Sequence, residues 1–228
     1  MTATAIATGT TDAIRCTRDA AVTRSLLGYG VLAGPLYVTV GFAQALTRDG
    51  FDLTRHSWSI LANGAWGWVQ SVSFLVTGLM TVAAAVGIRR ALGTGLGATW
   101  APRLLAVFGA CTAAEAFLRA DPALGFPAGT PVDAMEVSPL GAAHLAVGAV
   151  GFLSLIAAAF VLARRFRAEG RRGWAVASAG TAAAFLGSFV GISAGAGSRP
   201  TVVAFVAGVV IAYGWLAALS LHLYRRAA

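Results

Sequence analysis

Six long apolar runs, separated by short polar segments, make up almost the whole chain. A helix needs about 20 mostly apolar residues to cross the hydrocarbon of a bilayer, and each run reaches or nearly reaches that length. The runs are Ser25–Leu46, Trp66–Ile88, Leu104–Ala120, Ala142–Ala163, Trp174–Gly195 and Thr201–Tyr224. The pattern predicts an all-α polytopic membrane protein, a bundle of six transmembrane helices.

The stretch before the first run is polar and rich in Thr and Ala, with no apolar centre. A secretory signal needs such a centre, so none is expected here. We predict a disordered cytoplasmic tail over residues 1–24, followed by a single six-helix transmembrane domain over residues 25–228.

The arginines predict the orientation, because Arg and Lys near helix ends stay on the cytoplasmic side. With both termini in the cytoplasm, thirteen Arg lie inside. The four that remain outside are Arg48, Arg55, Arg119 and Arg199. The sequence therefore predicts that both termini are cytoplasmic.

The net charge of +8 follows the same distribution, since most of it lies at the predicted inner helix ends. Anionic lipid headgroups are the expected partner of such charge, and a nucleic acid is not expected. All 17 basic residues are Arg, and Ala and Gly are abundant, which is typical of a GC-rich genome. We expect a bacterial protein of the plasma membrane. No phosphate-binding loop and no facing His pair for haem is found, so no cofactor is predicted.

Ionisable residues within the third apolar run are the first candidates for chemistry. Glu115 and Arg119 are four residues apart and would share one helix face, with Asp121 at the outer end. Ionisable groups at membrane depth usually face a bundle interior or a cavity. One interpretation is a self-neutralising Glu115–Arg119 ion pair. The other is that Arg119 holds a polar head while Glu115 or Asp121 exchanges a proton.

Two histidines fall on the predicted outer side. His144 opens the fourth apolar run, and His56 lies in the first outer segment, close to Ser59. The spacing of these histidines and the outer acids matches no compact metal motif, so no metal is predicted. We take His144 as a catalytic candidate, and His56 and Ser59 as substrate-binding candidates.

Polar and aromatic side chains within the apolar runs extend the candidate site. Trp68 and Gln70 lie at the outer end of the second run, where Gln70 needs a hydrogen-bonding partner. Tyr213 and Trp215 lie near the middle of the sixth run. They either pack in the core or line an apolar pocket.

Small residues recur every four positions in the fifth run. They are Ala179, Ala183, Gly187, Gly191 and Gly195. Such a stripe lets another helix approach closely. It indicates packing within the bundle or, alternatively, a homo-oligomer interface.

Several short segments together resemble a known family. They are Arg55-His56-Ser57-Trp58-Ser59, Gly67-Trp68-Val69-Gln70, Phe117-Leu118-Arg119-Ala120-Asp121-Pro122 and Gly141-Ala142-Ala143-His144. Over roughly residues 26–224 the chain resembles bacterial six-helix membrane proteins grouped only as a domain of unknown function. The resemblance implies the same topology and a recurrent set of polar outer residues, and the positions that match the family pattern are Ser59, Asp121, Pro122, Gly141 and His144. It implies no activity.

Together these features predict an outward-facing polar pocket built from the ends of the second, third and fourth helices. We expect it to bind, or process, a lipid-like or other hydrophobic small molecule, with Arg119 and His144 on the polar head and Glu115 or Asp121 handling a proton. A proton-coupled carrier and a non-catalytic membrane scaffold or sensor are the alternatives.

Overall fold

The part of the chain that the structure describes folds into six consecutive α-helices and one short 3₁₀ helix. They are α1 (Ala3–Thr47), η1 (Trp58–Ala62), α2 (Gly67–Leu92), α3 (Trp100–Ala114), α4 (Pro139–Ala168), α5 (Arg172–Ala194) and α6 (Arg199–Tyr224). This computed structural model describes residues 3–133, 137–195 and 198–227, and no β-strand occurs among them. The predicted all-α class is confirmed.

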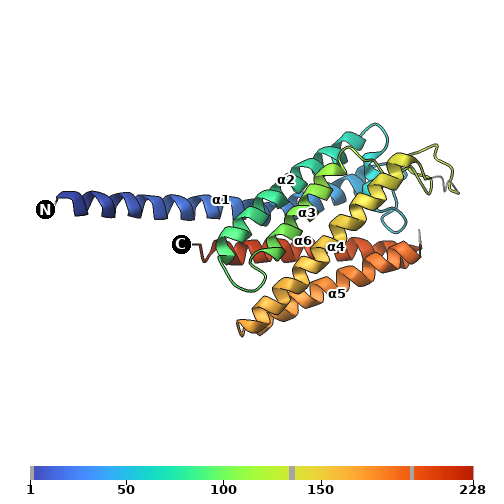
Figure 1. Ribbon diagram of the computed structural model, residues 1–228. Helices are drawn as coiled ribbons and strands as arrows, with labels where there is room; N and C mark the ends of the chain where they lie inside the picture. The colour runs from blue at the N-terminus through green and yellow to red at the C-terminus, as the bar shows by residue number, and fades with distance from the viewer. Residues whose placement is uncertain (1–2, 134–136, 196–197, 228) are drawn as a thin grey trace.

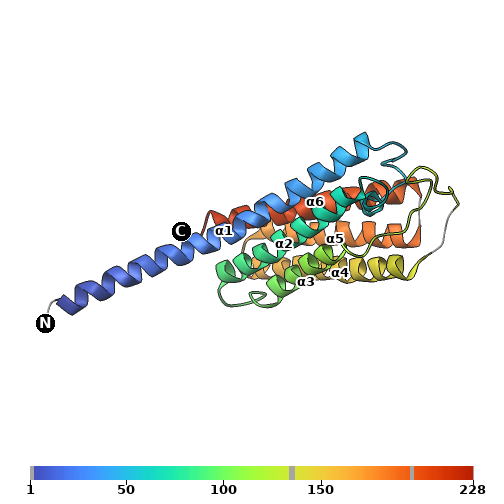
Figure 2. The same ribbon diagram turned by 90° about the horizontal axis from the view of Figure 1, so that it is seen from above.

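The helices form a closed ring in chain order. Each packs against its neighbours in sequence, and α6 returns to pack against α1 (Figures 1 and 2). Five helices are long and apolar enough to cross a membrane, and α3 is shorter. The protein is thus a polytopic helical membrane bundle. Both chain termini lie at one end (Figure 1), which we call the inner end; the opposite end is the outer end. Which end faces the cytoplasm stays a prediction.

Glycines let the helices approach closely where they cross. A methyl group at Gly78 of α2 would collide with the Ala113 amide and the Gly109 carbonyl of α3. One at Gly34 of α1 would lie 2.8 Å from the Tyr213 carbonyl of α6. Because apolar burial does not drive helices together within lipid, such backbone-to-backbone packing is a main source of bundle stability.

The first helix begins earlier than the sequence predicted. We expected it to start at Ser25 after a disordered tail, whereas α1 begins at Ala3. No proline interrupts residues 3–24, and alanine has the highest helix propensity. Near the bundle, Arg90 of α2 pairs with Asp19 at 3.1 Å and donates to Thr23 at 2.9 Å, which fixes the last turns of this extension.

The third helix ends earlier than predicted, at Ala114 rather than Ala120. The next residues form tight turns, in which Ala116 N bonds to the Ala113 carbonyl and Phe117 N to that of Ala114. The chain is already leaving the helix before Asp121, where the following Pro122 disfavours helical backbone.

Large apolar side chains fill the inner half of the ring. They include Leu27, Ile88, Leu105, Leu162, Phe166 and Leu219, all fully buried. Such packing leaves little room for a ligand between these side chains. The outer half of the ring is less completely filled.

Candidate functional site

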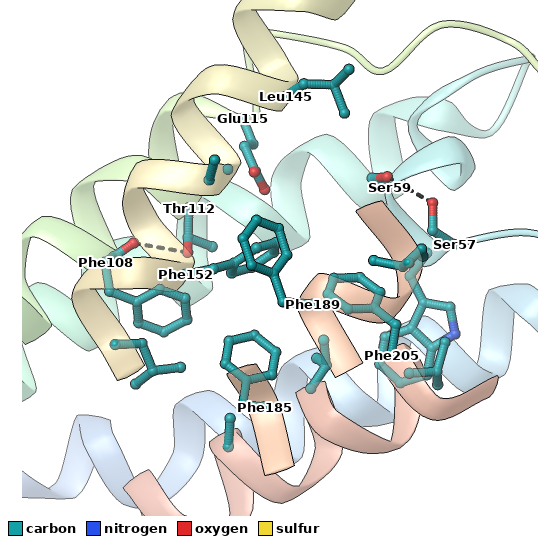
Figure 3. A pocket seen from close by; sticks show the side chains of 18 of the residues that line it. Ser57, Ser59, Phe108, Thr112, Glu115, Leu145, Phe152, Phe185, Phe189 and Phe205 are labelled. Atoms are coloured by element: carbon teal, nitrogen blue, oxygen red, sulfur yellow. Dashed lines mark hydrogen bonds between the residues drawn. The ribbon is translucent and has the colours of Figure 1, made fainter. Parts of the chain in front are cut away.

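A cavity of about 200 Å³ lies in the outer half of the ring, and all six helices and η1 contribute to its wall. Nine aromatic residues line it: Tyr37, Trp58, Phe74, Phe108, Phe152, Phe185, Phe189, Phe205 and Tyr213. Figure 3 shows phenylalanine rings gathered around the space from several helices. Apolar and aromatic lining with a few polar groups is typical of sites for small organic ligands.

The aromatic rings hold one another in place. Phe152 of α4 lies edge-on to Phe185, Phe189 and Phe205, with ring centroids 5.3, 5.4 and 5.5 Å apart. On the other side, the rings of Tyr37 and Tyr213 are 5.0 Å apart. Edge-to-face contacts at these distances are favourable, so the wall keeps its shape without a ligand.

The cavity reaches the protein surface beside the outer ends of α4 and α5. Leu145 of α4 lines the cavity although its side chain is 63% exposed, and Ser193 of α5 also lines it from an exposed position. Figure 1 shows that α4 and α5 meet at the inner end and lie further apart at the outer end.

Glu115 carries the only carboxylate among the described residues of the cavity wall, and it is 6% exposed. It caps the C-terminal end of α3, and in Figure 3 its side chain points into the space, toward the phenylalanine rings. Gly148 of α4 makes room for it, because a methyl group there would lie 2.8 Å from Glu115 Oε1. No hydrogen bond or ion pair reaches this carboxylate from any residue that the structure describes.

His144 lies on the same wall and is also buried. Its Nδ1 is 2.9 Å from the Leu118 carbonyl, which can only accept, so Nδ1 carries the hydrogen. The other ring nitrogen, Nε2, is then an acceptor in the neutral imidazole. Glu115 and His144 thus present acceptors to the same cavity, with no hydrogen bond between them. Both were predicted site residues.

Hydroxyl groups complete the polar part of the wall. Ser59, another predicted residue, pairs with Ser57 at 3.0 Å, and both line the cavity. Thr112 donates to the Phe108 carbonyl at 2.9 Å (Figure 3). Trp58 adds an indole N–H that has no partner among the described residues.

Arg119 does not take the expected place. It is exposed, it does not line the cavity, and it forms no ion pair with Glu115. The expected pairing assumed a continuous helix, in which residues four apart share one face. Because α3 ends at Ala114, that spacing no longer brings the two side chains together. The self-neutralising pair is therefore absent.

Asp121 lies outside the cavity wall and holds the start of α4. Its carboxylate accepts from Ser138 N at 2.9 Å and from Ser138 Oγ at 2.6 Å. Ser138 is the N-cap of α4, and its Oγ also accepts from Gly141 N at 3.0 Å. A methyl group at Gly141 would collide with the Asp121 carboxylate, so this glycine is part of the same cap. Negative charge at a helix N-terminus is favourable.

His56 is also bound away from the cavity. Its Nδ1 accepts from Asp52 N at 2.9 Å, so Nε2 donates to the Leu124 carbonyl at 3.1 Å. The bond to Leu124 joins the two outer loops. In the same turn, Thr54 donates to the Asp52 carboxylate through both N and Oγ1, which lowers the pKa of Asp52.

The remaining predicted residues divide between cavity and packing. Tyr213 lines the cavity, whereas Gln70 is fully buried outside it and accepts from Gln44 Nε2 at 2.8 Å. Trp68 is 60% exposed and stands beside Trp66. Trp215 donates to Ser178 Oγ at 3.0 Å, which joins α5 and α6.

The sequence analysis missed the contribution of α5 and the outer part of α6. Phe185 and Phe189 are four residues apart and so share a helix face, which was the available signal. The small-residue stripe that drew attention instead faces partly outward: Ala183 and Gly187 are exposed, and a methyl group at Gly187 would meet nothing within 4 Å. A homo-oligomer through this stripe stays a prediction.

The comparisons with known proteins give a family but no activity. A family described as "Protein of unknown function (DUF998)" matches residues 31–222, a range that includes the whole cavity wall. No curated protein and no solved structure matches the chain. The match covers most of the sequence and agrees with the resemblance found from its motifs, so the chain belongs to the DUF998 family of proteins of unknown function.

Proposed function

We propose that this membrane protein binds a hydrophobic small molecule with a polar head in its outer cavity. One observation carries the proposal: an aromatic cavity of about 200 Å³ contains a buried carboxylate that no described residue neutralises. Burying a charged or polar group without a partner is costly. A ligand that fills the apolar space and engages Glu115 would remove that cost.

The exposed lining residues of α4 and α5 support entry from the lipid phase. Leu145 and Ser193 border the opening on helices that are apolar enough to cross a membrane. A molecule dissolved in the outer leaflet could move between α4 and α5 without crossing water. The ligand is therefore lipid-like in its partitioning, with an apolar body of modest size.

The packed inner half favours a binding site over a carrier. A carrier must open its site to both sides of the membrane in turn. Buried side chains such as Leu105, Leu162 and Leu219 fill the inner half, and they would have to separate to make a path. Glu115 and His144 could also act on a bound molecule, but binding is the step that the geometry supports directly.

Native mass spectrometry of the purified protein tests the proposal. The test variant is Ala149→Phe, because Ala149 lines the cavity and a larger side chain would occupy it. The matched control is Ala146→Phe, on the same helix but at an exposed position away from the cavity. We expect a small molecule that co-purifies with the wild type and the control but not with Ala149→Phe.

Two results would count against binding in the cavity. One is a wild-type spectrum with no bound small molecule after purification from native membranes in mild detergent. The other is a bound molecule that persists in Ala149→Phe, since it would then occupy another surface.

A further inference from the structure

We propose that the ligand of the outer cavity is a hydrophobic amine, bound as its ammonium cation by Glu115 and the surrounding aromatic rings. This inference rests on the proposed function, because it names the chemical class of the molecule that the cavity takes. It follows from the charges, the hydrogen-bonding groups and the rings of the wall.

The charges of the wall favour a cation. Among the described residues that line the cavity, Glu115 is the only acidic side chain, and none of them is an arginine. The sequence contains no lysine. Arg48, at the outer end of α1, is held elsewhere by the carbonyls of Leu61 and Asn63. An anionic head would face an uncompensated carboxylate in surroundings of low dielectric, where repulsion is strong, whereas a cation would be attracted.

Two of the hydrogen-bonding groups point the same way. When it is ionised, the Glu115 carboxylate only accepts hydrogen bonds, as does Nε2 of His144, and neither group is engaged by a described residue. A ligand head that meets them must donate. An ammonium group has up to three N–H donors and accepts none, as a lysine side chain does.

The aromatic rings supply the rest of a cation site. A cation placed over aromatic faces is attracted by their quadrupoles, and the attraction grows when water is excluded. Phe152, Phe189 and Tyr213 belong to the same wall as Glu115, and Figure 3 shows Glu115 directed toward the phenylalanine rings. One carboxylate among many rings is a suitable environment for an amine with an apolar or aromatic body.

Three probes that share one carbon skeleton separate the effect of charge on binding from the effect of hydrophobicity. They are 4-phenylbutylamine, 4-phenylbutanol and 4-phenylbutanoate, which are cationic, neutral and anionic at pH 7. Each is radiolabelled, and its saturable binding to the full-length protein in lipid nanodiscs is measured by equilibrium dialysis. We expect the amine to bind at least about tenfold more tightly than the alcohol, with the carboxylate weakest.

Variants test whether Glu115 causes the tighter binding of the amine. Glu115→Gln keeps the shape of the side chain, and we expect it to weaken amine binding by about tenfold or more while alcohol binding changes little. Retained alcohol binding also shows that the variant is folded. Asp121→Asn is the matched control, because it removes an acid that does not line the cavity. Its amine affinity should equal that of the wild type.

The outcomes distinguish the two proposals. If the alcohol or the carboxylate binds as tightly as the amine and Ala149→Phe abolishes that binding, the cavity is a binding site but the amine assignment is wrong. An amine affinity that is unchanged in Glu115→Gln also overturns the assignment. If none of the probes binds in a saturable way, both proposals fail.

Discussion

Glu115 and Asp121 are acids close together in sequence whose surroundings give them different roles. Asp121 accepts two hydrogen bonds from Ser138 at the start of α4, so its charge is used within the fold. Glu115 is buried against Gly148 and receives no such bonds from the described residues. Glu115, which makes no hydrogen bond with the described residues, is therefore the acid that faces the cavity.

The cap formed by Asp121 gives a prediction about stability. Asp121→Ala should destabilise the protein by about 1–2 kcal/mol, because α4 loses a capping acceptor and Ser138 loses its partner. Asp133→Ala, in the same outer loop at an exposed position, should change stability by less than about 0.5 kcal/mol. Thermal unfolding in detergent compares the two. If both variants were equally stable, Asp121 would not contribute to the cap of α4.

The Asp52 turn predicts a pH dependence of the outer loop. Hydrogen bonds from Thr54 lower the pKa of Asp52 in the folded protein. Its stabilising contribution is therefore complete above the ordinary pKa of an aspartate and is lost as the pH falls through the lowered value. The unfolding temperature of Asp52→Ala should lie below that of the wild type at pH 7, and the gap should narrow in acid. A gap that widens in acid would contradict the assignment.

At the scale of the helices, glycine positions decide which pairs can pack closely. Gly78 and Gly109 bring the backbones of α2 and α3 into contact, whereas Gly187 of α5 faces open space. The sequence alone does not distinguish these positions, because each is a glycine within an apolar run. Their difference comes from the rotation of each helix in the ring.

Gly78→Ala and Gly187→Ala form a matched pair of variants. The first places a methyl group against the backbone of α3 and should destabilise the bundle by about 1–3 kcal/mol. The second adds helix propensity without a collision and should be neutral or stabilising by up to about 1 kcal/mol. Chemical unfolding in mixed micelles measures both. A strongly destabilised Gly187→Ala would instead indicate that this face packs against another copy of the chain.

The sequence was sufficient for the number of helices, and it singled out Glu115, His144 and Ser59, which line the cavity, since long apolar runs and buried polar groups are local signals. It left open whether Tyr213 lines a pocket or packs in the core. It was not sufficient for the end of α3, which depends on turns formed by residues 113–118 and on the bond between Leu118 and His144. Because the early end of α3 was not predicted, Arg119 was expected to lie beside Glu115 on one helix face. Residues of α5 line the cavity because of the way the ring of helices closes. No local sequence pattern predicts that closure.

For the whole molecule, the ring has a packed inner half and a hollow outer half, with both termini at the inner end. The distribution of arginines predicts that this inner end is cytoplasmic. The cavity would then open in the outer leaflet. A molecule from outside the cell could reach it without entering the cytoplasm.

Cysteine labelling in intact cells tests this orientation. In a variant with Cys16 and Cys111 replaced by alanine, Asp133→Cys should react with a membrane-impermeant maleimide, because residue 133 lies in the exposed outer loop. Arg167→Cys, exposed near the inner end of α4, should react only after the cells are opened. The reverse pattern would place the cavity on the cytoplasmic side.

Photoaffinity labelling tests the central claim, that the outer cavity is a binding site, most directly. A phenylalkylamine that carries a diazirine is bound to the protein in nanodiscs, activated by light and located by peptide mass spectrometry. The account predicts labelling of cavity residues from α4, α5 and α6, such as Phe152, Phe189 and Phe205, which Ala149→Phe suppresses. Labelling confined to lipid-exposed residues such as Trp66 and Trp68, and unchanged in Ala149→Phe, would contradict it.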